Sequence, residues 1–155
     1  MFNKVLVANR GEIAVRIIRA CREMNIRTVA IYSEADKDSF HTKLADEAIC
    51  VGPAISTKSY LNIKNILEAA SLSGVDSIHP GFGFLSENSD FAKMCEESNI
   101  KFIGPSYKVI DLIGNKSNSK ELMKSAGVPV IPGSEGSLKN LEEAKKIAKE
   151  IGFPI

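Results

Sequence analysis

The chain has 155 residues, enough for one domain with a buried core or for one domain and the beginning of another. Apolar residues make up 44% and charged residues 25%, as in ordinary soluble globular proteins, and the net charge of +1 gives no reason to expect a nucleic-acid footprint or a membrane-surface patch. No apolar run reaches the length of a membrane span and the first residues lack the apolar core of a signal peptide, so we expect a cytoplasmic protein.

The cysteines and histidines indicate a reducing compartment and a metal-poor chain. Cys21, Cys50 and Cys95 are odd in number, lie far apart and each fall within an apolar pattern, which predicts buried free thiols. His41 and His79 are the only histidines, and they are too few and too far apart for a usual zinc site.

The first two thirds of the chain alternate short β-rich runs with helical patterns. Strands are predicted at 4–8, 28–32, 47–51, 75–78 and 101–103. Apolar residues at helical spacing predict a short turn around Leu44 and helices at 12–24, 63–73 and 90–98. This alternation predicts an α/β fold with a parallel sheet and right-handed crossovers.

The first helix is predicted to bury one stripe and to expose another. Its inward stripe should consist of apolar residues at helical spacing, namely Ile13, Ile17, Ala20, Cys21 and Met24. The opposite stripe carries Arg16, Arg19 and Glu23. These charges form either a solvated helix face with i,i+3 and i,i+4 pairing or a polar subunit contact, and their spacing does not decide between the two.

The fourth predicted strand leads into the sequence His79-Pro-Gly-Phe-Gly-Phe-Leu-Ser-Glu-Asn88. Pro80 stops the strand, and Gly81 and Gly83 permit backbone angles and close approaches that a Cβ would prevent. Ser86 is predicted to be the N-cap of the helix that follows. Because parallel α/β sheets bind ligands at the carboxyl ends of their strands, we predict a site at this loop.

The side chains of this loop allow two interpretations. Phe82 and Phe84 lie beside His79 and Glu87, and Glu87 is placed where the dipole of the next helix favours a negative charge. The group is either a small hydrophobic plug or the lining of a cleft, in which Phe82 and the Gly83 amide receive a flat, neutral heterocycle. Two glycines around an exposed aromatic residue favour the cleft.

Two other turns are candidates for phosphate binding. The turn at 9–12 joins a strand to a helix whose amides can receive an anion, but it lacks the GxGxxG pattern, and Gly11 can serve simply to bring helix and strand together. Lys116 stands at a helix start and can reach a phosphate, although spacing alone favours an ordinary surface lysine. Glu34 and Asp36 are best explained as turn-forming acids of a solvated loop.

The pattern changes after Pro105. Prolines at 129 and 132 leave at best an edge strand at 128–131, and helices are predicted at 106–113, at 116–126 and from the capping box Asn140-x-x-Glu143 to Gly152. Residues 153–155 look like the start of a strand. We therefore expect a fragment or an excised domain.

Nearly end to end, the sequence resembles the N-terminal part of biotin carboxylase. Several long motifs carry the resemblance, in the order Val7-Ala-Asn-Arg-Gly-Glu-Ile-Ala14, Ala45-Asp-Glu47, Ser59-Tyr-Leu61, His79 to Asn88, Phe102-Ile-Gly-Pro105, Ala126-Gly-Val-Pro129 and Pro132-Gly133. The family comprises the biotin carboxylase subunits of acetyl-CoA carboxylase and the equivalent regions of pyruvate and acyl-CoA carboxylases.

The resemblance implies an ATP-grasp ligase that begins with a Rossmann-like domain, a parallel sheet with helices on both faces. Residues 1–113 would form that domain, and 114–155 would open the ATP-grasp domain. The implied reaction is the carboxylation of biotin on a carrier protein. ATP phosphorylates bicarbonate to carboxyphosphate, with Mg²⁺ on the phosphates, and the carboxyl group passes to biotin. The implied partners are the biotin carboxyl carrier protein, a carboxyltransferase and a second copy in a homodimer.

The resemblance also implies roles for individual residues. Lys116 falls on a lysine that contacts ATP, which overturns its interpretation as a surface lysine. His79, Phe82, Gly83 and Glu87 fall on the edge of the biotin and bicarbonate pocket. Phe82 stands where the family has tyrosine, so shape and stacking remain without the phenol hydroxyl.

The resemblance further places Arg16, Arg19 and Glu23 on a helix of the homodimer contact. The lysine of the next strand, the glycine-rich lid, the metal-binding glutamates and the arginine near biotin would all follow Ile155. We therefore expect no catalytic residue, no metal ligand and no turnover of ATP in the chain alone. The alternative from another class is a non-catalytic Rossmann-type module, which predicts saturable binding of NAD or AMP.

Overall fold

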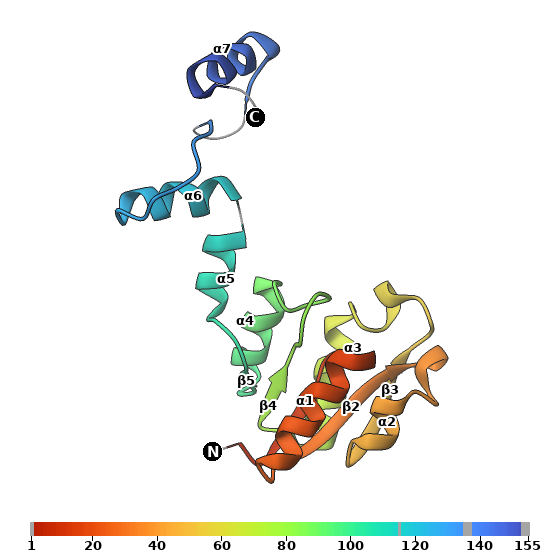
Figure 1. The fold of residues 1–155 in the computed structure, drawn as a ribbon. Helices are drawn as coiled ribbons and strands as arrows, with labels where there is room; N and C mark the ends of the chain where they lie inside the picture. Colours follow the sequence, from red (N-terminus) through yellow and green to blue (C-terminus); the bar gives the residue numbers. More distant parts are fainter. Residues whose placement is uncertain (1, 115, 135–137, 153–155) are drawn as a thin grey trace. The chain divides into compact units, whose positions relative to one another are not determined.

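The structure is a computed structural model that describes residues 2–114, 116–134 and 138–152 (Figure 1). The chain forms two compact units, Met1–Ile110 and Asp111–Ile155. Across the described ranges, the structure has no helix whose length and apolar character would let it cross a bilayer.

The first unit is built on a five-stranded sheet in which every pair of neighbouring strands is parallel. Its strands are β1 Lys4–Val7, β2 Arg27–Ser33, β3 Glu47–Gly52, β4 Ser77–His79 and β5 Lys101–Phe102. Their spatial order is β3-β2-β1-β4-β5, with Leu6 of the central strand paired to Val29 on one side and to Ile78 on the other. The predicted strands and the α/β fold are confirmed, and the strand order reverses between β1 and β4.

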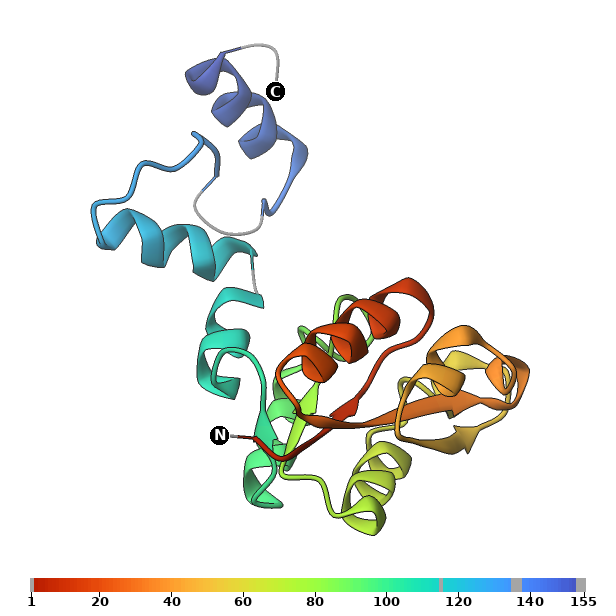
Figure 2. The ribbon, with the colours of Figure 1, turned by 60° about the horizontal axis from the view of Figure 1, so that its bottom comes forward.

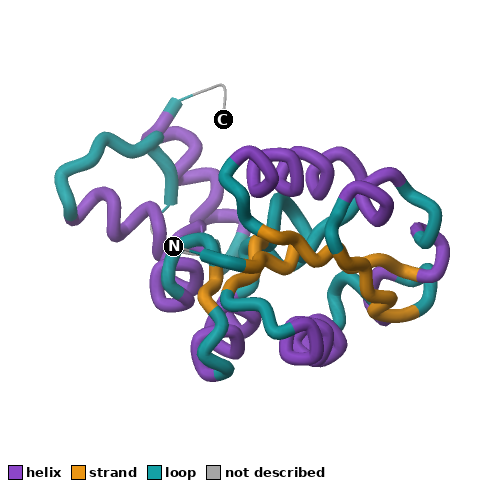
Figure 3. The backbone as a smooth tube through the Cα atoms, turned by 90° about the horizontal axis from the view of Figure 1, so that it is seen from below, coloured by secondary structure: helices purple, strands orange, loops and turns teal. Residues whose placement is uncertain are grey.

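Helices cover both faces of this sheet. They are α1 Gly11–Glu23, α2 Phe40–Leu44, α3 Ile63–Ser73 and α4 Ser89–Glu97, with short 3-10 turns η1 Glu34–Asp36 and η2 Ser56–Lys58. In Figure 2, α1 (red) and α3 (yellow-green) lie on opposite sides of the sheet, and the same layers are seen from below in Figure 3. The side chains of β1 alternate accordingly, because successive residues of a strand face opposite sides.

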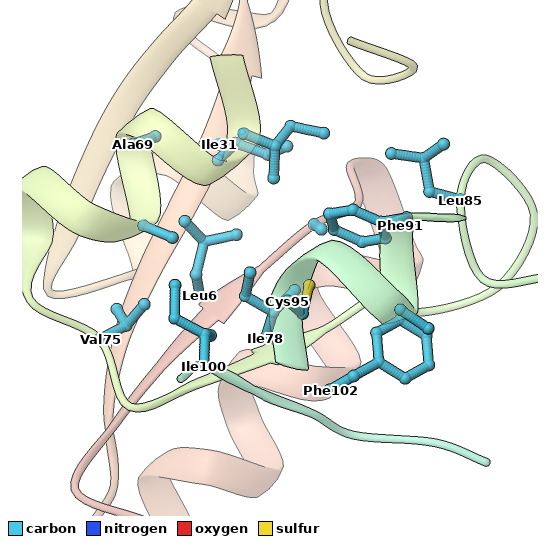
Figure 4. Close-up of a cluster of buried hydrophobic side chains, with 14 of the residues drawn as sticks. Leu6, Ile31, Ala69, Val75, Ile78, Leu85, Phe91, Cys95, Ile100 and Phe102 are labelled. Atoms are coloured by element: carbon cyan, nitrogen blue, oxygen red, sulfur yellow. The ribbon is translucent and has the colours of Figure 1, made fainter. Parts of the chain in front are cut away.

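The larger core lies between the sheet and helices α3 and α4 (Figure 4). Leu6 and Ile78 of the sheet meet Ala69 of α3 and Phe91 of α4 in this cluster. The Phe91 ring is fully buried and packs edge-on against Phe102, with ring centroids 5.9 Å apart and planes at 89°. Aromatic pairs favour this arrangement, so the Phe91 site joins α4 to the edge strand β5.

The buried stripe of α1 differs from the predicted one. Ala14, Ile18 and Cys21 are buried, whereas Ala20 is exposed and Met24 follows the helix with 62% of its surface exposed. The prediction was right for Cys21 and wrong for Ala20 and Met24, because the adjacent Ile17 and Ile18 lie on two apolar stripes about 100° apart, and both stripes have helical spacing.

The cysteines are free, as predicted, but only two of the three are buried. Burial raises the pKa of the Cys21 thiol and raises that of Cys95 to about 12. Cys50 is exposed, contrary to prediction. It lies on the edge strand β3, where one face of alternating residues meets solvent.

The second unit begins within helix α5 Tyr107–Gly114, whose Ile110 is buried in the core of the first unit. It contains α6 Lys116–Ser125 and α7 Leu141–Ile151. The Asn140 side chain accepts from the Glu143 amide at 2.9 Å, and the Glu143 carboxylate accepts from the Lys139 amide, one residue before the N-cap. Residues 128–134 form no strand, and the strand start predicted at 153–155 lies outside the described residues.

Candidate functional site

The predicted loop follows β4 at the carboxyl edge of the sheet, beside the reversal of strand order. Its polypeptide is tied to the end of β1, where the Ala8 amide donates to the His79 carbonyl at 2.9 Å. The next residue, Asn9, is 3% exposed and donates from its side-chain Nδ2 to two loop carbonyls, of Pro80 at 2.9 Å and of Phe82 at 2.8 Å. The loop is therefore attached to the central strand by both main-chain and side-chain hydrogen bonds.

Gly81 is needed where the loop meets Asn9. It has φ +70°, and a Cβ built on it would lie 2.6 Å from the Asn9 Nδ2 and 2.8 Å from the Ile13 Cγ2. A side chain at this position would push the loop away from Asn9. The close approach predicted for this glycine is thus found between the loop and the turn after β1.

His79 closes the first turn of the loop. Its Nδ1 lies 3.0 Å from the Gly81 amide, and since a backbone N–H can only donate, Nδ1 is the acceptor and the neutral ring carries its proton on Nε2. Burial lowers the pKa of His79. A neutral imidazole therefore holds the loop at neutral pH, and protonation at Nδ1 would remove this hydrogen bond.

Phe82 and Phe84 lie in different surroundings, one exposed and one packed against the core. The Phe82 side chain is 77% exposed, so it does not plug the core. Phe84 has φ +42°, an uncommon angle for a side-chain-bearing residue, and its ring stacks on the buried Tyr60 with centroids 5.0 Å apart. Phe84 thus anchors the loop and Phe82 presents an aromatic face to the surroundings.

Behind Phe84 lies a polar network that joins the ends of β1, β2 and β3. The guanidinium of Arg10 lies 5.3 Å from the centroid of the Tyr60 ring and 5.7 Å from that of Phe84, and it pairs with Asp36 at 3.2 Å. Tyr60 donates from its hydroxyl to the same Asp36 oxygen at 2.7 Å, and Ser33 donates from its hydroxyl at 2.9 Å. The Tyr60 oxygen accepts in turn from the Ser33 amide at 2.9 Å.

This network shifts the pKa values of its members in opposite directions. Burial opposes the ionisation of Asp36, but hydrogen bonds from Tyr60, Ser33 and Arg10 outweigh it and hold the pKa of the carboxyl below its ordinary value. Burial, reinforced by the hydrogen bond to Asp36, raises the pKa of Tyr60 to about 12. At neutral pH the network therefore contains an ionised Asp36 that accepts from a neutral phenol.

The start of α4 corrects two predictions. The N-cap is Asn88, whose side-chain oxygen accepts from the Phe91 amide at 2.7 Å, and not Ser86. Ser86 lies in the preceding turn, where its amide donates to the Gly83 carbonyl at 2.9 Å. Glu87 is exposed and precedes the N-cap, so the acidic residue in the first turn of α4 is Asp90. The prediction failed because Ser86 and Asn88 are both good caps and only the second is followed by helical backbone.

The other predicted site residues lie apart from this loop in the chain. Arg16, Arg19 and Glu23 are all exposed on α1, and within the part of the chain that the structure describes no ion pair joins them. Lys116 is the first residue of α6, in the second compact unit, and its neighbour Asn115 lies outside the described residues.

Sequence reasoning missed the Arg10 and Asp36 network and the part played by Asn9. Asp36 was predicted to be a solvated turn acid, yet it accepts from three side chains, because the residues that surround it come from three different strand ends. Gly11 is needed for its backbone angle, φ +58°, and not for close packing, since a Cβ there would meet nothing within 4 Å. His41 was also missed: it is 1% exposed, its Nε2 lies 3.2 Å from the Ile31 carbonyl, and burial lowers its pKa.

Comparison with known protein families divides the chain in two. The family described as "Biotin carboxylase, N-terminal domain" matches residues 1–110. The family described as "Carbamoyl-phosphate synthase L chain, ATP binding domain" matches residues 115–155. Biotin carboxylase 1 of Bacillus subtilis (strain 168) is 59% identical over 155 residues, which are 100% of this chain and 34% of that protein.

Solved structures agree with these matches. The biotin carboxylase domain dimer of Hydrogenobacter thermophilus 2-oxoglutarate carboxylase, in complex with MgADP, ADP and bicarbonate, is 58% identical with a TM-score of 0.93. Biotin carboxylase of Campylobacter jejuni in a β-γ-ATP complex is 52% identical with a TM-score of 0.94. Each comparison covers 99% of this chain and 34% of the other. The chain thus spans about a third of the length of the relatives that it matches.

Proposed function

Because the chain belongs to the biotin carboxylase N-terminal domain family, we propose that it provides the first part of an ATP-dependent biotin carboxylase. The reaction would use ATP, Mg²⁺ and bicarbonate to carboxylate biotin held on a carrier protein, with a carboxyltransferase as the next component. The observation that carries the proposal is the 59% identity to a biotin carboxylase across all 155 residues. Residues 1–113 are proposed as the Rossmann-like domain and 114–155 as the opening of the ATP-grasp domain.

We assign the loop after β4 to the edge of the biotin and bicarbonate pocket. Support comes from its place beside the reversal of strand order, where open parallel sheets bind ligands, and from the exposed ring of Phe82. Phe82 would contribute stacking, and Gly83 a backbone N–H. His79 would fix the turn and Glu87 would lie at the rim. Phenylalanine in place of the family's tyrosine leaves this aromatic contact without a hydrogen-bonding group.

We assign ATP contact to Lys116, which opens a helix as a phosphate-binding lysine commonly does. No group of three or more His, Cys, Asp or Glu side chains that could hold a metal ion is found within 2–114, 116–134 and 138–152. That the chain supplies no Mg²⁺ ligand stays a prediction. Arg16, Arg19 and Glu23, which are all exposed on α1, are assigned to a homodimer contact. A cytoplasmic location stays a prediction.

The proposal is tested with a chimera in which this chain replaces the matching region of the Bacillus subtilis relative. We expect bicarbonate-dependent ATP hydrolysis from the chimera and none from the chain alone, because the groups that stabilise phosphoryl transfer are supplied by the added part. Lys116→Gln should raise the KM for ATP, whereas Lys93→Gln, a matched exposed lysine on α4, should not.

Two results would overturn the assignment. One is a folded chimera that hydrolyses no ATP while the intact relative, assayed in parallel, remains active. The other is saturable binding of NAD or AMP by the chain alone, followed by amide NMR, which would favour a self-contained nucleotide-binding module.

A further inference from the structure

The side-chain amide of Asn9 makes three hydrogen bonds. Its two N–H groups donate to the carbonyls of Pro80 and Phe82, and its Oδ1 accepts from the Arg10 amide at 2.9 Å. Because Asn9 is 3% exposed, water does not replace these partners easily. The residue is thus a buried link between the end of β1 and the loop after β4.

The link fixes the orientation of the peptide that joins Phe82 to Gly83. In a trans peptide the C=O and the following N–H point in opposite directions. With the Phe82 carbonyl held at 2.8 Å from the Asn9 Nδ2, the Gly83 N–H points away from Asn9. Within the described residues this N–H donates to no other group, so it is available to a ligand.

Two further contacts hold the two ends of the loop in place. The Gly81 amide is already used by His79 Nδ1, and the exit of the loop is held by the stacking of Phe84 on Tyr60. The entry and the exit are therefore anchored, and the segment between them is attached to the sheet by Asn9. If the Asn9 bonds are lost, the Phe82 and Gly83 peptide is free to rotate between two fixed ends.

We propose that Asn9 is the positioning residue of this site: its two side-chain hydrogen bonds aim the Gly83 N–H and set the direction of Phe82. The ligand contact itself rests on the proposed function, but the positioning is a property of the chain and can be measured without a ligand. Asn9 would act through the loop, because its side-chain donors are used by the Pro80 and Phe82 carbonyls.

The direct test uses the unmodified chain. Scalar couplings measured by NMR across hydrogen bonds should connect the Asn9 Nδ2 to the carbonyl carbons of Pro80 and Phe82, and the side-chain amide protons should exchange slowly. Absence of both couplings in a folded sample would overturn the proposal. No substitution is required, so this measurement does not depend on whether a variant folds.

Two variants then disrupt the hydrogen bonds between Asn9 and the loop, one by a change at Asn9 and the other by a change in the loop. Asn9→Asp keeps the size but loses both donors, and Gly81→Ala places a Cβ against the Asn9 Nδ2. Both should shift the Gly83 amide resonance, because the peptide that joins Phe82 to Gly83 would lose its fixed orientation. Asn65→Asp is the matched control, because it removes an equivalent 2.8 Å side-chain donor to the Val51 carbonyl away from the loop. A Gly83 signal that stays at its wild-type position in both folded variants would contradict the proposal.

In the active chimera, Asn9→Asp should lower kcat/KM for free biotin by about 10- to 100-fold through a raised KM, since small misplacements near reacting groups have effects of this size. The KM for ATP should change less than about twofold. A purely structural role would instead lower kcat, by reducing the active fraction, with KM unchanged. If the unmodified chimera is inactive, the proposed function fails while the NMR result still decides the role of Asn9.

Discussion

Replacement of Asp36 by asparagine should destabilise the first unit although the side chain keeps its size. Asp36 accepts from Tyr60 at 2.7 Å, from Ser33 at 2.9 Å and from Arg10 at 3.2 Å. Asparagine retains one acceptor oxygen but no charge. Its amide group also brings two donors into a site whose neighbours are themselves donors.

The size of the effect follows from these contacts. A hydrogen bond to a charged group contributes about 1.5–3 kcal/mol and a neutral one about 0.5–1.5 kcal/mol, so the Tyr60 and Ser33 bonds should together lose about 2 kcal/mol. The Arg10 pair has side chains 45% and 20% exposed and should add at most about 0.5 kcal/mol. We expect the free energy of unfolding to fall by about 2–3 kcal/mol.

Urea unfolding measures this change, with an unchanged m value as the sign that only stability has altered. Glu34→Gln is the matched control, since Glu34 is exposed in the same 3-10 turn and should change stability by less than about 0.5 kcal/mol. In a double-mutant cycle, Asp36→Asn and Tyr60→Phe should be non-additive by about 1 kcal/mol, because they share one hydrogen bond. Additive effects, or an Asp36→Asn variant as stable as Glu34→Gln, would refute the network.

Four further outcomes are expected. Burial lowers the pKa values of His41 and His79, so the unfolded chain binds protons before the folded chain does as the pH falls. The contribution of these histidines to the free energy of unfolding should be fully present above about pH 6.5 and decline below it. Urea midpoints that stay constant between about pH 7 and 5.5 would contradict this prediction. Phe91→Ala should lower the free energy of unfolding, measured by urea titration, by about 3–5 kcal/mol. A loss below about 1 kcal/mol would mean that the surrounding side chains close around the smaller residue. A thiol reagent should modify Cys50 rapidly in the folded chain and the two buried cysteines only on unfolding; equal rates would contradict the burial pattern. Arg19→Glu should lower the sedimenting mass of a dimeric chimera, and an unchanged mass would remove the proposed contact.

The sheet was predictable because its signals are local. Strands β1, β2 and β3 are runs rich in apolar and β-branched residues, and the shorter β4 and β5 are each followed closely by a proline or glycine. Such signals do not depend on what lies elsewhere in the chain. The face of α1 was not predictable in the same way, since Ile17 and Ile18 satisfy helical spacing in two registers. Packing against β1 and β2 selects the register that buries Ile18.

The site was only partly predictable for a related reason. The loop at 79–88 carries its own signals of glycines, aromatics and a histidine, so its position could be found from sequence. The residues that hold the loop carry no such local signal, because Asn9 and Tyr60 follow different strands and meet the loop only once the sheet is formed. These contacts depend on the strand order β3-β2-β1-β4-β5, which places the end of β1 beside the end of β4 and cannot be read from the sequence pattern.

The central claim is that this chain forms one edge of a pocket in which biotin is carboxylated. Its most direct test is the transfer of labelled carbon from bicarbonate to free biotin by the chimera with the Bacillus subtilis relative, with ATP and Mg²⁺ present. The account predicts labelled carboxybiotin from the chimera and a strongly reduced yield after Asn9→Asp. A folded chimera that forms no carboxybiotin would contradict the account.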